Sequence, residues 1–346
     1  MKALEDVLYG GMIGEGEEVY RFESEFAQTF RLPRGLATSS GTGALHIALM
    51  LADIAPGDEV VTTSMTAEPT NTVIMQCGAK PVFADVDSQT GNLDPTSVEA
   101  LVTPRTRAIV VVHYAGFPAN LRALRGIADQ FDIPLIEDCA HALGASYDQN
   151  GIGTMGDYAI FSFQAIKHMT TVDGGILTMR DSSKAVRARK LRWFGMAKGV
   201  PRTEVDIAEV GYKYNMNNVA AVIGLTQLET IKSCIDKHIE NGRFYDEAIA
   251  AIPGLEVTRI DPGCEPSYWL FTILSENSEA VERCLAEIGV SASKLHRPNH
   301  YHSIFAPMRR LMPGLDTYYR RLTHIPCGWW VSQEDRERIV DALRKG

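Results

Sequence analysis

The stretch that decides the fold is FSFQAIKHMTT, residues 161–171, and it is followed closely by Gly174 and Gly175. Lys167 stands in this stretch just after an apolar run, and such runs are typical of strands buried on both faces. Upstream, EDCAHALG (137–144) places Asp138 at the end of another apolar run. Earlier still, SSGTGAL (39–45) places small and hydroxyl-bearing residues ahead of a helical pattern. The chain therefore presents a candidate anion cradle, an acid and a lysine, in that order.

Together the three stretches carry the groups that a pyridoxal phosphate (PLP) site requires. A lysine amine forms a Schiff base with the aldehyde of this cofactor, and an aspartate pairs with its ring nitrogen. Backbone N–H groups at a helix N-terminus, with Ser and Thr hydroxyls, suit its phosphate. We therefore expect PLP as the cofactor and Lys167 as the catalytic residue.

Each stretch taken alone has a more ordinary interpretation. Residues 39–45 could be a helix N-cap with a tight turn, and Asp138 could cap the helix that follows it. Lys167 could be an exposed loop lysine, and His141 could be a buried histidine with its ring nitrogens hydrogen-bonded. The occurrence of all three stretches in one chain favours the cofactor site.

Composition narrows the classes of protein that the chain can represent. It has 346 residues, 45% of them hydrophobic, and a formal net charge of −9, which argues against binding to nucleic acid or to anionic membranes. No apolar run is long enough to span a membrane. The six cysteines lack C-x-x-C spacing and the nine histidines lack metal-ligand spacing. We expect reduced thiols, a cytoplasmic location and no metal site.

Short apolar runs alternate with helical patterns in the first part of the chain, which indicates an open and largely parallel α/β sheet. The predicted strands are 59–62, 81–86, 108–113, 134–138, 159–163 and 175–179, and the predicted helices among them are 43–51, 71–78 and 120–131. After Gly211 the pattern changes to helices at 219–232, 234–252, 278–288 and 333–344, with a strand at 267–274. We expect a large domain of residues 1–235 and a small C-terminal α/β domain of residues 236–346.

The three stretches resemble those of the DegT-type (DegT/DnrJ/StrS) sugar aminotransferases, a branch of the aspartate aminotransferase fold. The resemblance runs from about Gly10 to the C-terminus, and FSF-x-x-x-K is its specific element. It implies a fold-type-I PLP-dependent transferase, with a mainly parallel sheet of the seven-stranded type flanked by helices. It also implies that an amino group moves from L-glutamate to a keto or aldehyde sugar, through pyridoxamine phosphate. A homodimer with active sites at the subunit interface is expected on the same grounds.

By the same resemblance, particular residues should contact the cofactor or the substrate. The expected cofactor contacts are Gly41, Thr42, Gly43, Asp138, His141, Ser162, Lys167 and, reaching the neighbouring subunit, Lys213. The expected substrate contacts are His296, Arg297 and His302, which lie in a C-terminal stretch where family members place polar contacts. Gly14 is a further expected contact, because glycine permits close approach of the backbone to a ligand. Lys213 could instead be a solvated surface lysine, and Gly14 could belong to a flexible loop. The basic segment 184–202 is either a solvated helix face or a contact for an anionic sugar nucleotide.

Three positions keep alternative functions open. Ala67 stands where the family often has a ring-stacking aromatic residue, and Lys213 stands where it has Asn. A related branch has histidine in place of the lysine and dehydrates sugars, but here His168 only follows Lys167, which favours transamination. The alternatives are a PLP-dependent sugar dehydratase, an aminotransferase acting on a free keto sugar acid, and a non-catalytic protein that kept the fold. An NAD-dependent oxidoreductase lacks its G-x-G-x-x-G motif after an early strand.

Overall fold

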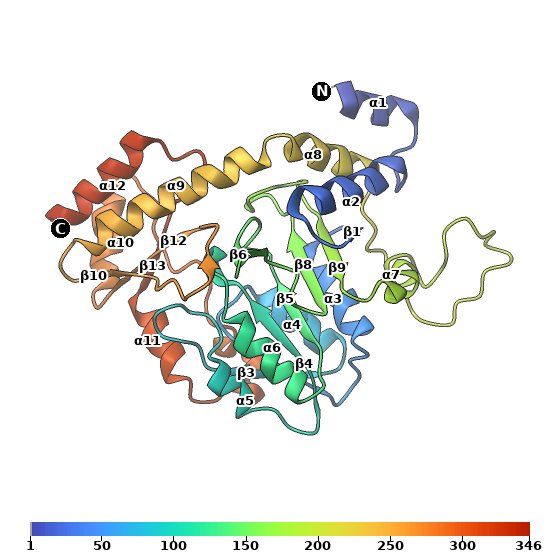
Figure 1. Ribbon diagram of the computed structural model, residues 1–346, viewed down its shortest axis with the longest axis horizontal. Helices are drawn as coiled ribbons and strands as arrows, with labels where there is room; N and C mark the ends of the chain where they lie inside the picture. The colour runs from blue at the N-terminus through green and yellow to red at the C-terminus, as the bar shows by residue number, and fades with distance from the viewer. Residues whose placement is uncertain (1) are drawn as a thin grey trace.

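The computed structural model describes residues 2–346 and is built around a central seven-stranded sheet (Figure 1). In spatial order, its strands are β1 (Leu36–Thr38), β9 (Gly175–Met179), β8 (Tyr158–Ser162), β5 (Leu135–Asp138), β4 (Thr106–Val112), β2 (Glu59–Thr63) and β3 (Lys80–Ala84). Strand β9 is antiparallel to its neighbours β1 and β8, whereas the remaining neighbours pair in parallel. The expected α/β class with a mainly parallel sheet is confirmed.

Helices cover both faces of this sheet. On β4, Ile109 and Val111 join one core cluster while Ala108 and Val110 join another, because successive side chains of a strand point to opposite faces. The first cluster includes residues of α2 (Glu17–Phe30), α5 (Pro95–Glu99), α6 (Leu121–Gln130) and α8 (Asn218–Leu228). The second includes residues of α3 (Gly41–Leu51), α4 (Glu68–Gln76) and α7 (Ala185–Arg192). Burial on both faces explains why the strands read as continuous apolar runs.

The predicted strands of the first part all form, within a few residues of the expected bounds. Strand β1 was not predicted, because three residues are too few to show a pattern. The predicted strand 267–274 begins only at Phe271, because residues before it hydrogen-bond to the segment at 115–116 instead of a strand partner. Helix α3 begins two residues before its predicted start, since Ser40 caps it by accepting a hydrogen bond from the Gly43 N–H at 3.0 Å.

A smaller antiparallel sheet lies among the C-terminal elements. It consists of β10 (Leu255–Val257), β12 (Phe271–Ser275) and β13 (Leu322–Ile325). The helices of this part are α9 (Ile231–Ala250), α10 (Ser278–Glu287), α11 (Pro313–Arg321) and α12 (Gln333–Lys345). A short ribbon pairs β6 (Ser146–Tyr147) with β7 (Asn150–Gly151), which both follow β5 in the chain, and with β11 (Cys264–Glu265), which follows β10. Helix α1 (Lys2–Gly10) begins the chain.

Helix α9 runs from the elements around the large sheet to those around the small one (Figure 1). Its first turns contribute Ile231 and Ile235 to the first core cluster, and its later turns contribute Tyr245 and Ile249 to a third cluster around β12 and β13. The expected division at residues 235 and 236 falls inside this helix, and the two-domain division stays a prediction.

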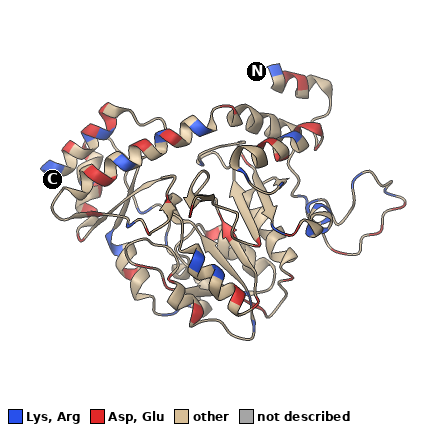
Figure 2. Ribbon diagram, in the orientation of Figure 1, with Lys and Arg blue, Asp and Glu red and all other residues tan. Residues whose placement is uncertain are grey.

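Charged residues lie mainly on the outer helices and not in the central sheet. Strands of the large sheet carry few charges, whereas α9 and α12 carry side chains of both signs (Figure 2). In residues 2–346, every helix is too short or too polar to cross a membrane.

Candidate active site

A cavity of about 390 Å³ opens at the carboxyl ends of β4, β5 and β8. This is the edge at which open α/β sheets bind ligands, and the volume suits a small molecule. The predicted site residues in its lining are Gly41, Thr42, Asp138, His141, Ser162, Lys167 and His296. The structure therefore brings together residues from four segments that are far apart in the chain.

Lys167 lies in the loop that follows β8, with its Nζ 4.0 Å from the centroid of the Trp269 ring. Burial lowers the pKa of Lys167 to about 8, while the charge of Asp138 acts in the opposite direction. An amine with a pKa in this range is partly uncharged near neutral pH, so it can act as a nucleophile and as a general base.

Asp138 is the last residue of β5 and is buried. Its Oδ2 accepts a hydrogen bond from the Thr70 hydroxyl at 2.9 Å, and its Oδ1 accepts one from the Ala140 N–H at 3.1 Å. Burial raises the pKa of Asp138, and these two hydrogen bonds and the charge of Lys167 oppose that rise. A carboxylate held in this way favours a proton on a ring nitrogen placed against it.

The N-terminus of α3 faces the same cavity through Ser40, Gly41 and Thr42. Free backbone N–H groups at a helix N-terminus bind anions, and Ser162 adds a hydroxyl at the cavity wall.

The backbone around this cradle is packed so closely that glycine is required. A Cβ on Gly41 would lie 2.9 Å from the Cβ of Ser162, and a Cβ on Gly175 would lie 2.5 Å from the backbone nitrogen of Gly41. The two glycines thus let β9 and the start of α3 approach each other beside the lysine loop.

Three rings are stacked beside the lysine. The rings of His141 and Trp269 are stacked with centroids 3.9 Å apart, and the ring of His296 lies parallel to that of His141 at 5.7 Å. Burial and the nearby charge of Lys167 hold the pKa of His141 well below its ordinary value and lower the pKa of His296 to about 4. Both imidazoles are therefore neutral at pH 7. Within residues 2–346, Nδ1 of His141 and Nε2 of His296 have no hydrogen-bond partner, so they are available to a ligand.

Five predicted contact residues lie outside the lining of this cavity. Gly43 faces the Tyr214 ring and donates its N–H to Ser40, so it lies just behind the cradle. The carbonyl oxygen of Gly14 accepts a hydrogen bond from the Asn218 N–H at 2.9 Å, at the start of α8.

The other three residues point away from the cavity or lie at its rim. Lys213 donates to Oδ1 of Asn215 at 2.9 Å and is exposed; its expected role concerned a neighbouring subunit. Arg297 is exposed over the Tyr301 ring, and Nε2 of His302 lies 3.4 Å from the carboxylate of Glu68, which does line the cavity. The binding roles of all five stay predictions.

Two important side chains of the cavity region were not predicted. Thr70 lies three residues after Ala67, and nothing in the sequence indicates its hydrogen bond to Asp138. Trp269 comes from the segment before β12, 102 residues after Lys167, and no local pattern marks it.

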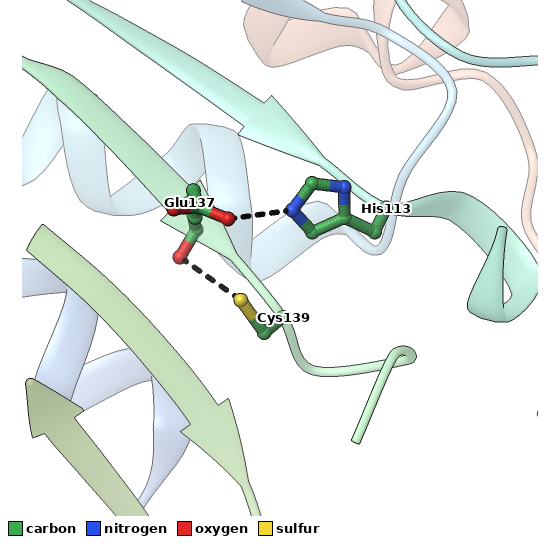
Figure 3. Close-up of side chains that lie close together, drawn as sticks. All are labelled: His113, Glu137 and Cys139. Carbon is green, nitrogen blue, oxygen red and sulfur yellow. Dashed lines mark hydrogen bonds and ion pairs between the residues drawn. The ribbon is translucent and has the colours of Figure 1, made fainter. Parts of the chain in front are cut away.

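A buried cluster of His113, Glu137 and Cys139 supports β5 behind Asp138 (Figure 3). Nδ1 of His113 accepts the Ala119 N–H at 3.1 Å, so Nε2 carries the proton and donates to Glu137 at 3.2 Å. Glu137 also accepts backbone N–H groups of the loop at residues 153–156. The three residues are close enough to bind a metal ion, but these hydrogen bonds already use both ring nitrogens and both carboxylate oxygens. The cluster is a structural network that ties β4, β5 and this loop together.

The cavity fits PLP group by group. The α3 N-terminus with Ser162 suits a phosphate, Asp138 suits a ring nitrogen, and the unpartnered Nδ1 of His141 suits a ring oxygen. Lys167 supplies the amine for the aldehyde. Fold and site together define a PLP-dependent enzyme of fold type I.

Comparison with known proteins identifies the family. The profile of the DegT/DnrJ/EryC1/StrS aminotransferase family matches residues 1–344, so the chain belongs to this family and is a PLP-dependent aminotransferase. The spore coat polysaccharide biosynthesis protein SpsC of Bacillus subtilis is 32% identical, over 98% of this chain and 92% of that protein. The structure of AtS13 from Actinomadura melliaura is 38% identical with a TM-score of 0.96, covering 100% of this chain and 95% of that one. The structure of the sugar aminotransferase CalS13 from Micromonospora echinospora is 36% identical with a TM-score of 0.96, covering 100% of this chain and 96% of that one.

Proposed function

We propose that this aminotransferase moves the amino group of L-glutamate to a keto or aldehyde carbon of a sugar, in a polysaccharide or amino-sugar pathway. The observation that carries the proposal is the single cavity shared by the Lys167 amine, the Asp138 carboxylate and the α3 N-terminus. The sugar part is supported by CalS13, which is described as a sugar aminotransferase, and by SpsC, which is named for polysaccharide biosynthesis. A nucleotide-linked deoxy sugar is the proposed acceptor, and a free keto sugar acid is the alternative.

The residues of the cavity have distinct proposed roles. When bound, PLP carries the amino group between substrates and accepts the electron pair of a broken C–H bond. The α3 N-terminus and Ser162 bind the phosphate, and Asp138 keeps a proton on the ring nitrogen. Lys167 holds the cofactor through its aldehyde and, once displaced, moves a proton at the substrate carbon.

The position of His168 favours this reaction over sugar dehydration. His168 is buried, lies outside the cavity lining and has its Nε2 3.0 Å from the carbonyl oxygen of Ser267. Lys167 and not His168 therefore faces the cofactor site. A dehydratase that uses a histidine in place of the lysine would need the opposite arrangement.

We propose a homodimer whose active sites include residues of both subunits. The cavity is lined by the carboxylates of Glu68, Asp138 and Asp173, and among residues 2–346 no arginine lines it. L-glutamate carries two carboxylates, whereas Lys167 is the one lysine or arginine that the described part of the chain places in this lining, so a cation from a second copy would favour binding of the substrate. The exposed Lys213 of a second copy is the proposed additional cation. Apolar side chains that a partner would cover include Tyr9, Met12 and Val172, which are 89%, 69% and 62% exposed.

A cytoplasmic location is the remaining part of the proposal. It is supported by the six cysteines, all of which are free thiols in the structure. Free thiols are typical of proteins from reducing compartments.

The first experiment is visible absorption spectroscopy of the protein with PLP, before and after addition of L-glutamate. We expect a band of the lysine-linked cofactor that glutamate bleaches, present in the wild type and in Lys190→Ala, whose lysine is exposed on α7, but absent in Lys167→Ala. A band that glutamate does not change would refute glutamate as the donor. Absence of any band that depends on Lys167 would refute the site itself.

Shared active sites are tested by mixing two inactive variants. Lys167→Ala and Lys213→Ala each damage a different half of a composite site. Refolded together, they should form mixed dimers with one intact site and recover about a quarter of the activity, because half of the dimers are mixed and each has one working site of two. No recovery of activity, or a monomer by sedimentation, would contradict the shared site.

The sugar class is identified by comparing the activity of the enzyme on acceptors with and without a linked nucleotide.

A further inference from the structure

Residues 267–270, just before β12, reach the active site from the C-terminal part of the chain. The Ser267 N–H donates to the carbonyl oxygen of Gly116 at 3.0 Å, and the Leu270 N–H donates to that of Ala115 at 3.3 Å. A Cβ on Gly116 would lie 2.7 Å from the backbone nitrogen of Trp269, so only glycine allows this approach. Segment 267–270 is thereby attached to the loop that follows β4.

Segment 267–270 also holds the lysine loop on both sides of Lys167. Nε1 of Trp269 donates to the carbonyl oxygen of Ile166 at 2.8 Å. In return, Nε2 of His168 donates to the carbonyl oxygen of Ser267 at 3.0 Å. The residues immediately before and after Lys167 are therefore both hydrogen-bonded to segment 267–270.

The indole of Trp269 forms the wall against which the amine lies. Trp269 is only 5% exposed, and Nζ of Lys167 lies 4.0 Å from its ring centroid. The same ring is stacked on His141, with an angle of 17° between the two planes. An aromatic face attracts an ammonium group, so the indole restricts where the free amine can lie.

Helix α9 holds segment 267–270 from behind through residues spaced four apart, which lie on one face of the helix. Nδ1 of His238 lies 2.9 Å from the carbonyl oxygen of Tyr268, and the Tyr268 hydroxyl donates to Asp246. Between them, a Cβ on Gly242 would lie 2.2 Å from the Tyr268 ring, so this residue has to be glycine. Tyr268 and Ala115 both have positive φ, 47° and 54°, a conformation that costs free energy in residues other than glycine and is often found at functional sites.

We propose that Trp269 is a positioning residue of the reaction: its indole face holds the free amine of Lys167 at the cofactor site, and its N–H fixes the lysine loop. The proposal rests on the proposed function, because it takes Lys167 as the reacting amine. It assigns to a residue outside the large sheet a role in catalysis by this aminotransferase.

The test compares Trp269→Leu, which removes the aromatic face, with Trp269→Phe, which keeps a ring but loses the N–H. Trp329→Phe is the control, since Trp329 is 55% exposed and packs against Trp330. In the enzyme loaded with pyridoxamine phosphate, the Lys167 amine is free. Its pKa is then measured from the pH dependence of its acetylation by acetic anhydride, read by peptide mass spectrometry.

We expect the wild type, the control and Trp269→Phe to share one midpoint, below the pKa of an ordinary lysine. In Trp269→Leu the midpoint should fall by roughly half to one pH unit, because the ammonium form loses its aromatic partner. An unchanged or raised midpoint in Trp269→Leu would overturn the role of the indole face.

Steady-state kinetics supply the second measurement and remain available if Trp269→Leu does not fold. Trp269→Phe should lower kcat several-fold with little change in KM for the amino donor, because the N–H bond positions the lysine and does not bind substrate. An unchanged kcat would overturn the role of the N–H. If the wild type shows the Lys167-dependent band while these variants behave like the control, the inference fails and the proposed function stands. If the wild type lacks that band, the proposed function itself has failed.

Discussion

The hydroxyl of Thr70 donates a hydrogen bond of 2.9 Å to Oδ2 of Asp138, although 68 residues separate the two in the chain. Thr70 lies in the first turn of α4, and Asp138 ends β5. Thr70 is itself 3.0 Å from the Thr66 hydroxyl, and the Thr66 carbonyl oxygen accepts a hydrogen bond from Asn299 at 2.7 Å. Asp138 is thus held by a chain of polar groups that extends to Asn299, the first residue of η3 (Asn299–Tyr301).

Replacement of Thr70 by valine should weaken cofactor binding. The variant keeps the shape of the side chain but loses a hydrogen bond to a buried carboxylate, worth about 1.5–3 kcal/mol. The pKa of Asp138 should rise further, and the dissociation constant for PLP should increase about tenfold or more. Fluorescence titration with PLP measures this constant. Thr72→Val, on the same helix and bonded only to the Pro69 carbonyl oxygen, is the control and should bind PLP normally.

The pH dependence of cofactor attachment should report the lowered pKa of Lys167. The uncharged amine attacks the aldehyde, so the rate should rise with pH and level off above pH 8, where the amine is largely deprotonated. With an ordinary lysine, the rate of attachment would continue to rise up to about pH 10.4. Stopped-flow absorbance between pH 6.5 and 9.5 distinguishes these two pH profiles.

Lys167→Arg should lower kcat by about two to four powers of ten, because the guanidinium group stays charged. A smaller loss would show that Lys167 takes no part in the reaction.

Gly175→Ala should disturb the phosphate cradle. The added Cβ would lie 2.5 Å from the Gly41 nitrogen and 2.6 Å from the carbonyl carbon of Ser40, both backbone atoms. We expect a loss of about 1–3 kcal/mol in the free energy of unfolding, with weaker binding of PLP. Gly126→Ala is the matched control in α6, where nothing lies within 4 Å, and should stabilise the protein by about 0.5–1 kcal/mol. Urea unfolding measures the free energy of unfolding of both variants. Equal changes in the two would show that the phosphate cradle tolerates a side chain at Gly175.

His324 should make the protein less stable in mild acid. Both of its ring nitrogens are hydrogen-bonded, to Tyr114 at 2.9 Å and to Thr272 at 3.0 Å, and burial lowers its pKa to about 3. Below pH 6.5 the unfolded state therefore binds a proton that the folded state does not, so stability falls as pH falls towards 3. Between pH 6.5 and 5.5 this one histidine contributes a loss of roughly 1 kcal/mol.

The measurement is urea unfolding at these two pH values for the wild type and for His324→Gln. The variant should be less stable at both values, but its loss on acidification should be smaller by roughly 1 kcal/mol. His302→Gln, at a half-buried position beside Glu68, is the control. An identical loss in wild type and His324→Gln would show that His324 takes up its proton in the folded state.

The amino-acid sequence was sufficient to predict six of the seven strands of the large sheet and to place Asp138 and Lys167 at one edge of it. Strands buried on both faces must be apolar throughout, so β2, β4, β5 and β8 are visible as runs. Asp138 and Lys167 each follow such a run, and the carboxyl ends of parallel strands meet at one edge of a sheet. Their proximity could therefore be predicted without knowledge of the packing.

The surroundings of those two residues were decided only by the tertiary structure. Trp269 donates to Ile166 across 103 residues, and Asn299 donates to Thr66 across 233. Apolar periodicity reports that a residue is buried but not which residue it meets, since partners are selected by how the core clusters pack. The sequence by itself thus determined which strands form this edge of the sheet and that Asp138 and Lys167 follow them. Only the folded chain decided that Thr70 holds the acid and that Trp269, carried by the C-terminal part, lies against the amine.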